Sequence, residues 1–164
     1  MTRVMNNAFR WPVRIYWEDT DAGGIVYYAN YLKYMERARS EWLRSLGIEQ
    51  TQLKEREGLM FVVVRAEVDF RTPARYGDLL HVTCEVAQSR RASLTFKQDI
   101  VRATADPEAD PQVESRADPV ADSGVLVTGQ IRIACLDVEK FRPRSMPEAM
   151  LHEIAGWRKS LNDG

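Results

Sequence analysis

One long amphipathic helix pattern, in residues 30–46, constrains the fold of this chain most. Apolar side chains recur there every three or four residues, as they do along one face of an α-helix, at Tyr31, Met35, Ala38, Trp42 and Leu46. Gly47 suits the residue that follows such a helix, because glycine readily adopts a left-handed conformation. At its standard rise this helix would be about 25 Å long, enough to lie across a whole small sheet.

Strand patterns make up most of the remaining regular structure. Alternating or β-branched runs occupy residues 12–18, 59–70, 78–86, 92–101 and 125–137. The short turns between the later runs favour an antiparallel meander. A short terminal helix is predicted over residues 145–161. We therefore expect an α+β fold in which one long amphipathic helix packs against one antiparallel sheet of about five strands.

A single helix cannot cover both faces of such a sheet. We therefore expect dimerisation, through sheets that join edge to edge, or a higher homo-oligomer such as a tetramer.

Length and charge narrow the class of protein. The 164 residues are close to the usual size of one domain, and we expect one domain over residues 1–164. A net charge of −1 argues against nucleic acid as the partner, because phosphate binding favours a basic excess. No apolar run predicts a membrane span, and residues 1–10 lack the apolar core of a signal peptide. A cytoplasmic protein is expected.

Cysteine and histidine usage predicts neither a metal nor a cofactor. Cys84 and Cys135 stand in separate apolar stretches, so we expect buried thiols rather than a disulfide or metal ligands. His81 and His152 are the two histidines, and no His/Cys pair has the spacing of metal ligands. No glycine-rich phosphate loop is present.

An acidic stretch interrupts the strands at about residues 103–124. The triplet Ala-Asp-Pro occurs three times in it, and Arg116 is the one basic residue among six acidic ones between residues 106 and 122. Proline and like charges oppose both helix and strand, so we predict a mobile hairpin loop.

The segment WEDTDAGGIVYYANY, residues 17–31, concentrates the candidate chemistry. Gly23 and Gly24 let the chain turn sharply from the first strand into the helix, which places Asp21 beside a helix start. Helix starts carry unpaired N–H groups and partial positive charge, which can stabilise an oxyanion. A carboxylate with such a helix end suits the hydrolysis of an acyl compound.

A purely structural reading of the same residues is also open. Asp19 and Asp21 are favoured in turns and at helix starts for local hydrogen bonding alone. Tyr27, Tyr28 and Tyr31 are typical of core or interface packing. From the residues alone, this reading stands ahead of catalysis.

The run YWEDTDAGGIVYYANYLKYMERAR, followed by WLRSLG, resembles the hotdog-fold thioesterases of the 4-hydroxybenzoyl-CoA thioesterase type. Within them it is most similar to the acyl-CoA thioesterases associated with the Tol-Pal system of Gram-negative bacteria. The later stretches FVVVRAEVDFRTPARYGDLLHV and RIACLD resemble the same group. The likeness covers most of residues 10–150 and implies a hotdog fold, in which the antiparallel sheet wraps around the long central helix.

Carried over by position, the resemblance implies specific roles. Asp21 matches the catalytic carboxylate, as nucleophile or general base, and the backbone N–H of Tyr28 matches the group that polarises the thioester carbonyl. Arg90, Arg91 and Ser93 match an Arg-Arg-x-Ser segment that meets the coenzyme A nucleotide, and Arg suits phosphate contacts. Many Tol-Pal-associated members carry His where this chain has Tyr28. If that imidazole takes part in the reaction, the Tyr28 side chain can replace it only in part.

The resemblance implies an acyl-CoA thioesterase that forms free acid and CoA, with short-to-medium aliphatic chains favoured over aromatic ones and acyl carrier protein as a further possible partner. A non-catalytic acyl-CoA or acyl-carrier-protein binding scaffold is the alternative, since a fold does not fix a function. A hotdog dehydratase is disfavoured because His81 and His152 lack the expected setting.

Overall fold

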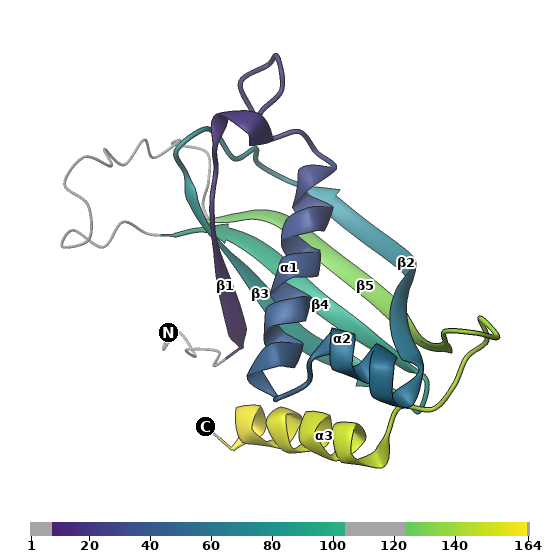
Figure 1. Ribbon diagram of the computed structural model, residues 1–164. Helices are drawn as coiled ribbons and strands as arrows, with labels where there is room; N and C mark the ends of the chain where they lie inside the picture. Colours follow the sequence, from purple (N-terminus) through teal and green to yellow (C-terminus); the bar gives the residue numbers. More distant parts are fainter. Residues whose placement is uncertain (1–7, 104–123, 164) are drawn as a thin grey trace.

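The computed structural model describes residues 8–103 and 124–163, and the predicted acidic loop lies almost wholly outside this part. Five antiparallel strands form one sheet: β1 (Phe9–Arg14), β2 (Leu59–Phe70), β3 (Leu79–Ser89), β4 (Ser93–Arg102) and β5 (Val125–Asp137). The long helix α1 (Asn30–Ser45) lies across one face of the sheet, and α3 (Glu148–Asn162) covers one end (Figure 1). The predicted α+β hotdog arrangement of a sheet around a long helix is confirmed.

The strand order is β1-β3-β4-β5-β2, so the sheet is a meander only over β3, β4 and β5. The expectation of a continuous meander is wrong for β2, which pairs with β5 and not with β3. The connection between β2 and β3 passes the start of α1, where the backbone N–H of Ala74 donates to the Tyr31 hydroxyl at 3.0 Å. Strands β4 and β5 therefore lie between two strands that are neighbours in sequence.

The core lies between α1 and the sheet. The helix buries the apolar stripe that its periodicity predicted, with Met35, Ala38 and Trp42 fully covered, and Gly47 follows it at φ 76°. Cys84 and Cys135 are buried free thiols, as predicted.

Several predicted boundaries are wrong: β1 starts at Phe9 rather than residue 12, and β3 ends at Ser89 rather than residue 86. Two further differences have a visible cause. The first strand ends at Arg14 rather than residue 18, because the Asp19 carboxylate accepts the Tyr16 N–H at 2.8 Å and draws residues 17–19 into a 3₁₀ turn. The terminal helix begins at Glu148 rather than residue 145, because buried Met146 is held in the preceding segment by its N–H, which donates to the Arg91 carbonyl at 2.8 Å.

A short segment between α1 and β2 was not predicted. It consists of α2 (Gln50–Gln52) and a π-helical turn (Leu53–Glu57), and Gly58 ends it at φ 65°. Leu53 is the buried residue of this segment. Because a single apolar side chain anchors the segment, its sequence shows no repeating apolar pattern from which a helix could be predicted.

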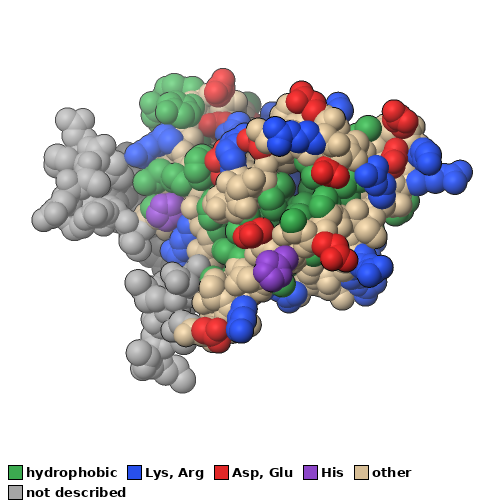
Figure 2. Space-filling model, turned by 60° about the horizontal axis from the view of Figure 1, so that its bottom comes forward, with side chains coloured by type: hydrophobic (Ala, Val, Ile, Leu, Met, Phe, Trp, Pro, Cys, Tyr) green, Lys and Arg blue, Asp and Glu red, His purple; other side chains and the backbone are tan. Residues whose placement is uncertain are grey.

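The face of the molecule at the α3 end is mixed in charge (Figure 2). Figure 2, turned to bring the α3 end forward, shows acidic and basic side chains interspersed over the visible face. Within the described ranges, no helix is both long and apolar enough to cross a membrane.

Candidate functional site

The loop between β1 and α1 is a tight turn centred on the two glycines. An isolated β-bridge joins Thr20 to Val26, and the Asp21 N–H donates to the Ile25 carbonyl at 2.9 Å. Gly24 has φ 75°, a left-handed conformation that a side chain would strain. The chain therefore doubles back on itself between β1 and the helix, as the sequence predicted.

The carboxylate of Asp21 is fixed at the start of this turn. Its Oδ1 accepts the Gly23 N–H at 2.8 Å, and a Cβ on Gly23 would lie 3.1 Å from that oxygen. The structural reading of Asp21 is thus correct as far as it goes. The bond from Gly23 uses only Oδ1 of Asp21. Among the hydrogen bonds of residues 8–103 and 124–163, none uses Oδ2. In the single chain the side chain is exposed.

Asp19 ties the turn to the helix. Its carbonyl oxygen accepts the Tyr27 N–H and the Asn30 side-chain amide, both at 2.9 Å. The loop that carries Asp21 is therefore held against the first residue of α1 from two directions.

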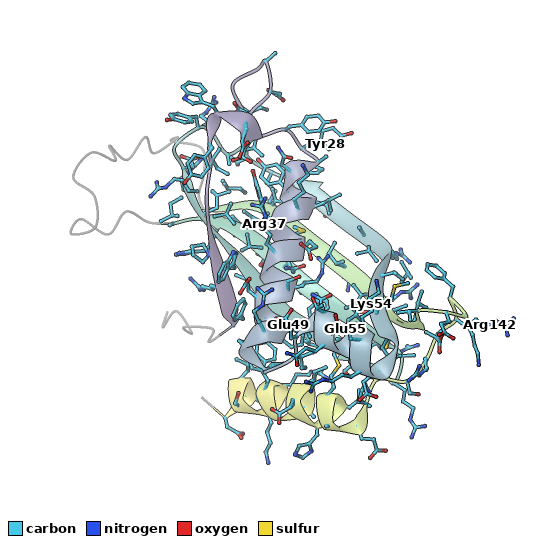
Figure 3. The ribbon with its side chains drawn as sticks, viewed as in Figure 1. Tyr28, Arg37, Glu49, Lys54, Glu55 and Arg142 are labelled. Atoms are coloured by element: carbon cyan, nitrogen blue, oxygen red, sulfur yellow. The ribbon has the colours of Figure 1, made fainter. Side chains whose placement is uncertain are left out.

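The start of α1 offers free N–H groups. The first turn contains no acidic side chain, and its N-cap residue Ala29 makes no side-chain capping bond. Within the described part of the chain, the Tyr28 N–H has no acceptor. The Tyr28 side chain is exposed beside the edge of Phe70, with ring centroids 6.0 Å apart (Figure 3). A carbonyl oxygen placed here would meet an unpaired donor and the positive end of the helix dipole.

The electrostatics of Tyr31 show that Asp21 acts on the same end of the helix. Burial is the largest cause that raises the pKa of Tyr31, and the charges of Asp78 and Asp21 add to it. The hydrogen bond from Ala74 and the charge of Arg102 oppose these effects. The Asp21 carboxylate is therefore within electrostatic reach of the first turn of α1.

Arg90, Arg91 and Ser93 lie elsewhere. The two exposed arginines lie in the turn between β3 and β4, and Ser93 is the first residue of β4. The Arg90 N–H donates to the Ser93 carbonyl at 2.9 Å. The Asp21 loop is at the other end of β3, an 11-residue strand that spans on the order of 35 Å. One chain therefore does not bring the predicted phosphate contacts and the predicted carboxylate together.

A cavity of about 540 Å³ lies between α1 and β2. Its lining combines apolar and charged side chains: Leu32, Lys33, Glu36, Arg37, Arg39, Val63, Ala66 and Ile131. Arg39 is buried, and it was not predicted from the sequence. The signal that could have found it is Gln98, a polar residue at an inward position of β4 between buried Phe96 and Ile100.

The thioesterase-like superfamily model matches residues 15–154. An acyl-CoA thioesterase YbgC from Haemophilus influenzae is 37% identical over 88% of this chain and 93% of its own length, and an Escherichia coli acyl-CoA thioester hydrolase YbgC is 37% identical over 89% and 95%. A Bartonella henselae structure described as a probable thioesterase is 32% identical, with a TM-score of 0.69 over 84% of this chain and 98% of that one. The chain belongs to the thioesterase-like superfamily.

Proposed function

We propose that this protein hydrolyses the thioester bond of acyl-CoA and releases a free carboxylic acid and CoA. The observation that carries the proposal is the arrangement at the start of α1. There the Asp21 carboxylate is fixed by one oxygen, and the unpaired Tyr28 N–H stands at the beginning of the same helix.

The two groups have complementary roles in this reaction. The Tyr28 N–H, aided by the helix dipole, donates a hydrogen bond to the thioester oxygen and stabilises the negative charge that develops there. The Asp21 carboxylate attacks the carbonyl carbon or removes a proton from an attacking water molecule. The thiolate of CoA is the leaving group in either case. Direct attack leaves a mixed anhydride on Asp21, which a water molecule then hydrolyses to release the acid and restore the carboxylate.

The relatives support an acyl-CoA substrate. Proteins 37% identical over nearly their whole length carry the names acyl-CoA thioesterase and acyl-CoA thioester hydrolase. We favour short-to-medium aliphatic acyl groups, since the cavity beside α1 has apolar walls in Leu32, Val63 and Ile131.

A panel of thioesters tests the proposed function. We expect the purified protein to release free thiol from short and medium alkyl acyl-CoA, measured with a thiol reagent, faster than from aromatic acyl-CoA or an acylated carrier protein. Tight binding of acyl-CoA with no thiol release across the panel would contradict hydrolysis and favour a binding role.

We also propose that the complete site needs two copies of the chain. Strand β2 is a 12-residue edge strand, and Val63 and Phe70 are each about half exposed on its helix-facing side. Antiparallel pairing of β2 with a second β2 would cover these side chains and continue the sheet. The two-fold axis would then place Arg90 and Arg91 of the second copy at the same end as Asp21.

Mixing two inactive variants tests this shared site. We expect Asp21→Asn and the double variant Arg90→Ala/Arg91→Ala to recover up to about a quarter of wild-type activity when they are unfolded and refolded together at equal amounts, assayed at low substrate. Half of the random dimers would be mixed, and one of the two sites in each would be intact.

The outcome distinguishes a shared site from one within a single chain. If Asp21 and the arginines served the same chain's site, every site in a mixed dimer would carry one defect and no activity would return. Light scattering on the wild type provides the accompanying control, and a monomer would contradict the proposal directly.

The remaining properties complete the proposal. We place the activity in the cytoplasm, because Cys84 and Cys135 are unpaired thiols, as expected in a reducing compartment. We treat residues 1–164 as one hotdog domain, of which the family model covers residues 15–154.

A further inference from the structure

Arg39 is a cation buried in the interior of the chain. Its exposed fraction is 7%, and within residues 8–103 and 124–163 no carboxylate forms an ion pair with it. A buried charge without a counter-ion is costly, and removal from water lowers the pKa of this guanidinium. Such a residue needs an explanation beyond packing.

Gln98 holds the guanidinium in one orientation. Arg39 Nη1 donates to Gln98 Oε1 at 2.9 Å, and the Gln98 amide in turn donates to the Met35 carbonyl at 3.0 Å and the Thr83 carbonyl at 3.3 Å. Gln98 is fully buried, so both ends of its amide are set by fixed neighbours. The bond engages one of the five N–H donors of a guanidinium and leaves others for a ligand.

The cavity beside α1 is where such a ligand would lie. Arg39 lines it together with the apolar side chains of Leu32, Val63, Ala66 and Ile131. Leu32 belongs to the first turn of α1, close to Tyr28, whereas Arg39 is nine residues beyond the start of the helix, about 14 Å along its axis. Lys33 in the first turn of α1 and Val63 toward the start of β2 line the same cavity, so apolar and charged side chains are interspersed along its wall. Arg39 is the buried cation among them, and it lies at that distance from the proposed reaction centre.

Burial lowers the pKa of Arg39 and the charge of Glu36 opposes this lowering, but among the described residues no ion pair joins the two side chains. Glu36 is exposed, and its Oε1 accepts the Ser40 hydroxyl at 2.7 Å. Lys33 and Arg37 are exposed and add further positive charge at the rim. The chain thus presents a net cationic end to whatever occupies the cavity.

We propose that Arg39 is a specificity-determining residue that selects acyl groups ending in a carboxylate. This inference rests on the proposed thioesterase activity and narrows its substrate class to medium-length acyl-CoA with an apolar middle and an anionic far end. The alkyl part lies against the apolar walls, and the terminal carboxylate accepts the free N–H groups of the guanidinium.

Matched pairs of substrates test the inference. We expect wild-type kcat/KM to be higher for adipoyl-, suberoyl- or sebacoyl-CoA than for the alkyl acyl-CoA of the same length, with the preference mainly in KM. Arg39→Met should reduce this preference by about tenfold to a hundredfold, the range of a charge-assisted hydrogen bond, while hydrolysis of the alkyl partner persists.

Two further variants keep the test interpretable. Arg39→Met/Gln98→Leu removes the buried polar pair as a unit, so that no unpaired amide remains, and should show the same loss of preference if the single variant folds poorly. Arg37→Met removes an equal charge from the cavity rim and should keep the preference.

The results that would overturn the inference are specific. The inference would be overturned if the wild type hydrolysed octanoyl-CoA with a kcat/KM as high as that for suberoyl-CoA. It would also be overturned if the preference for a terminal carboxylate depended on Arg37 and not on Arg39. Either result would leave the proposed thioesterase activity unaffected. A wild type that hydrolyses no acyl-CoA would overturn both.

Discussion

Replacing Asp21 by asparagine is expected to lower kcat for acyl-CoA hydrolysis by about a thousandfold or more, because positioned general bases and nucleophiles each contribute on this scale. The amide has nearly the shape of the carboxylate but carries no negative charge. It can neither attack the thioester carbonyl nor remove a proton from water. Steady-state release of free thiol from the best substrate of the panel measures the loss.

The same substitution should leave the fold intact. The Asp21 Oδ1 accepts the Gly23 N–H at 2.8 Å, and an asparagine oxygen can accept that bond equally. The turn is also held by the backbone bond from Asp21 to Ile25 and by the left-handed Gly24. The midpoint of urea unfolding is therefore expected to match that of the wild type.

Asp19→Asn is the matched control, since it removes the same charge two residues away. The Asp19 carboxylate accepts the Tyr16 N–H, a bond that the amide oxygen can also form, and the Asp19 carbonyl holds Asn30 of the helix. Burial is the main cause that raises the pKa of Tyr34, and the Asp19 carboxylate adds to it, so Asp19→Asn also changes the surroundings of one side chain of α1. Activity should stay within about tenfold of the wild type, the scale of a surface hydrogen bond. Equal losses in the two variants would show that the turn needs charge in general and would remove the catalytic role from Asp21.

The elements of this fold that repeat a pattern over many residues could be predicted from the sequence. Helix α1 starts at Asn30, and β2 and β5 have the predicted bounds, because each contains enough periodic or β-branched residues to define its limits. The end of β1 could not be predicted in this way. Its last residues alternate like a strand, yet a single side-chain bond from Asp19 converts them into a 3₁₀ turn.

The order of the strands could not be predicted from their periodicity. Strands β2 and β3 follow one another in sequence, but β2 pairs with β5, the last strand of the sheet along the chain, and periodicity gives the face of a strand and not its neighbour. The connection between β2 and β3 is held at the start of α1 by the bond between the Ala74 N–H and the Tyr31 hydroxyl. Tyr31 was predicted only for the apolar stripe of the helix, so this polar contact was missed.

The positions of the site residues could likewise be predicted only in part. Asp21 and the start of α1 are neighbours along the chain, so their proximity followed from the two glycines. Arg90 and Arg91 are placed by the length of β3, which carries them to the opposite end of the sheet. Dimerisation through sheet edges was expected from the single helix, but the sequence did not indicate which edge strand would pair. The structure places β2 at one edge of the sheet, and this position is the basis of the proposed two-copy site.

Replacing Trp42 by alanine is expected to cost about 3–5 kcal/mol of unfolding free energy, the range for a fully buried aromatic side chain. Trp42 has no exposed surface, and its ring meets Phe96 of β4 at 5.2 Å and Trp157 of α3 at 5.3 Å between centroids, both edge-on. The substitution would leave a cavity where α1, the sheet and α3 meet. Urea unfolding, followed by circular dichroism at one fixed protein concentration, measures the change.

Two comparisons separate the packing of the ring from other effects. Trp42→Phe should cost clearly less, because it keeps an aromatic ring and removes an indole N–H that is buried without an acceptor in the described residues. Trp17→Ala makes the same truncation at a side chain that is 72% exposed and should cost under about 1 kcal/mol. If Trp42→Ala cost no more than Trp17→Ala, the helix would not be fixed to the sheet through this contact. The apolar stripe of α1 would then have to be stabilised mainly by its first half, at Tyr31 and Met35.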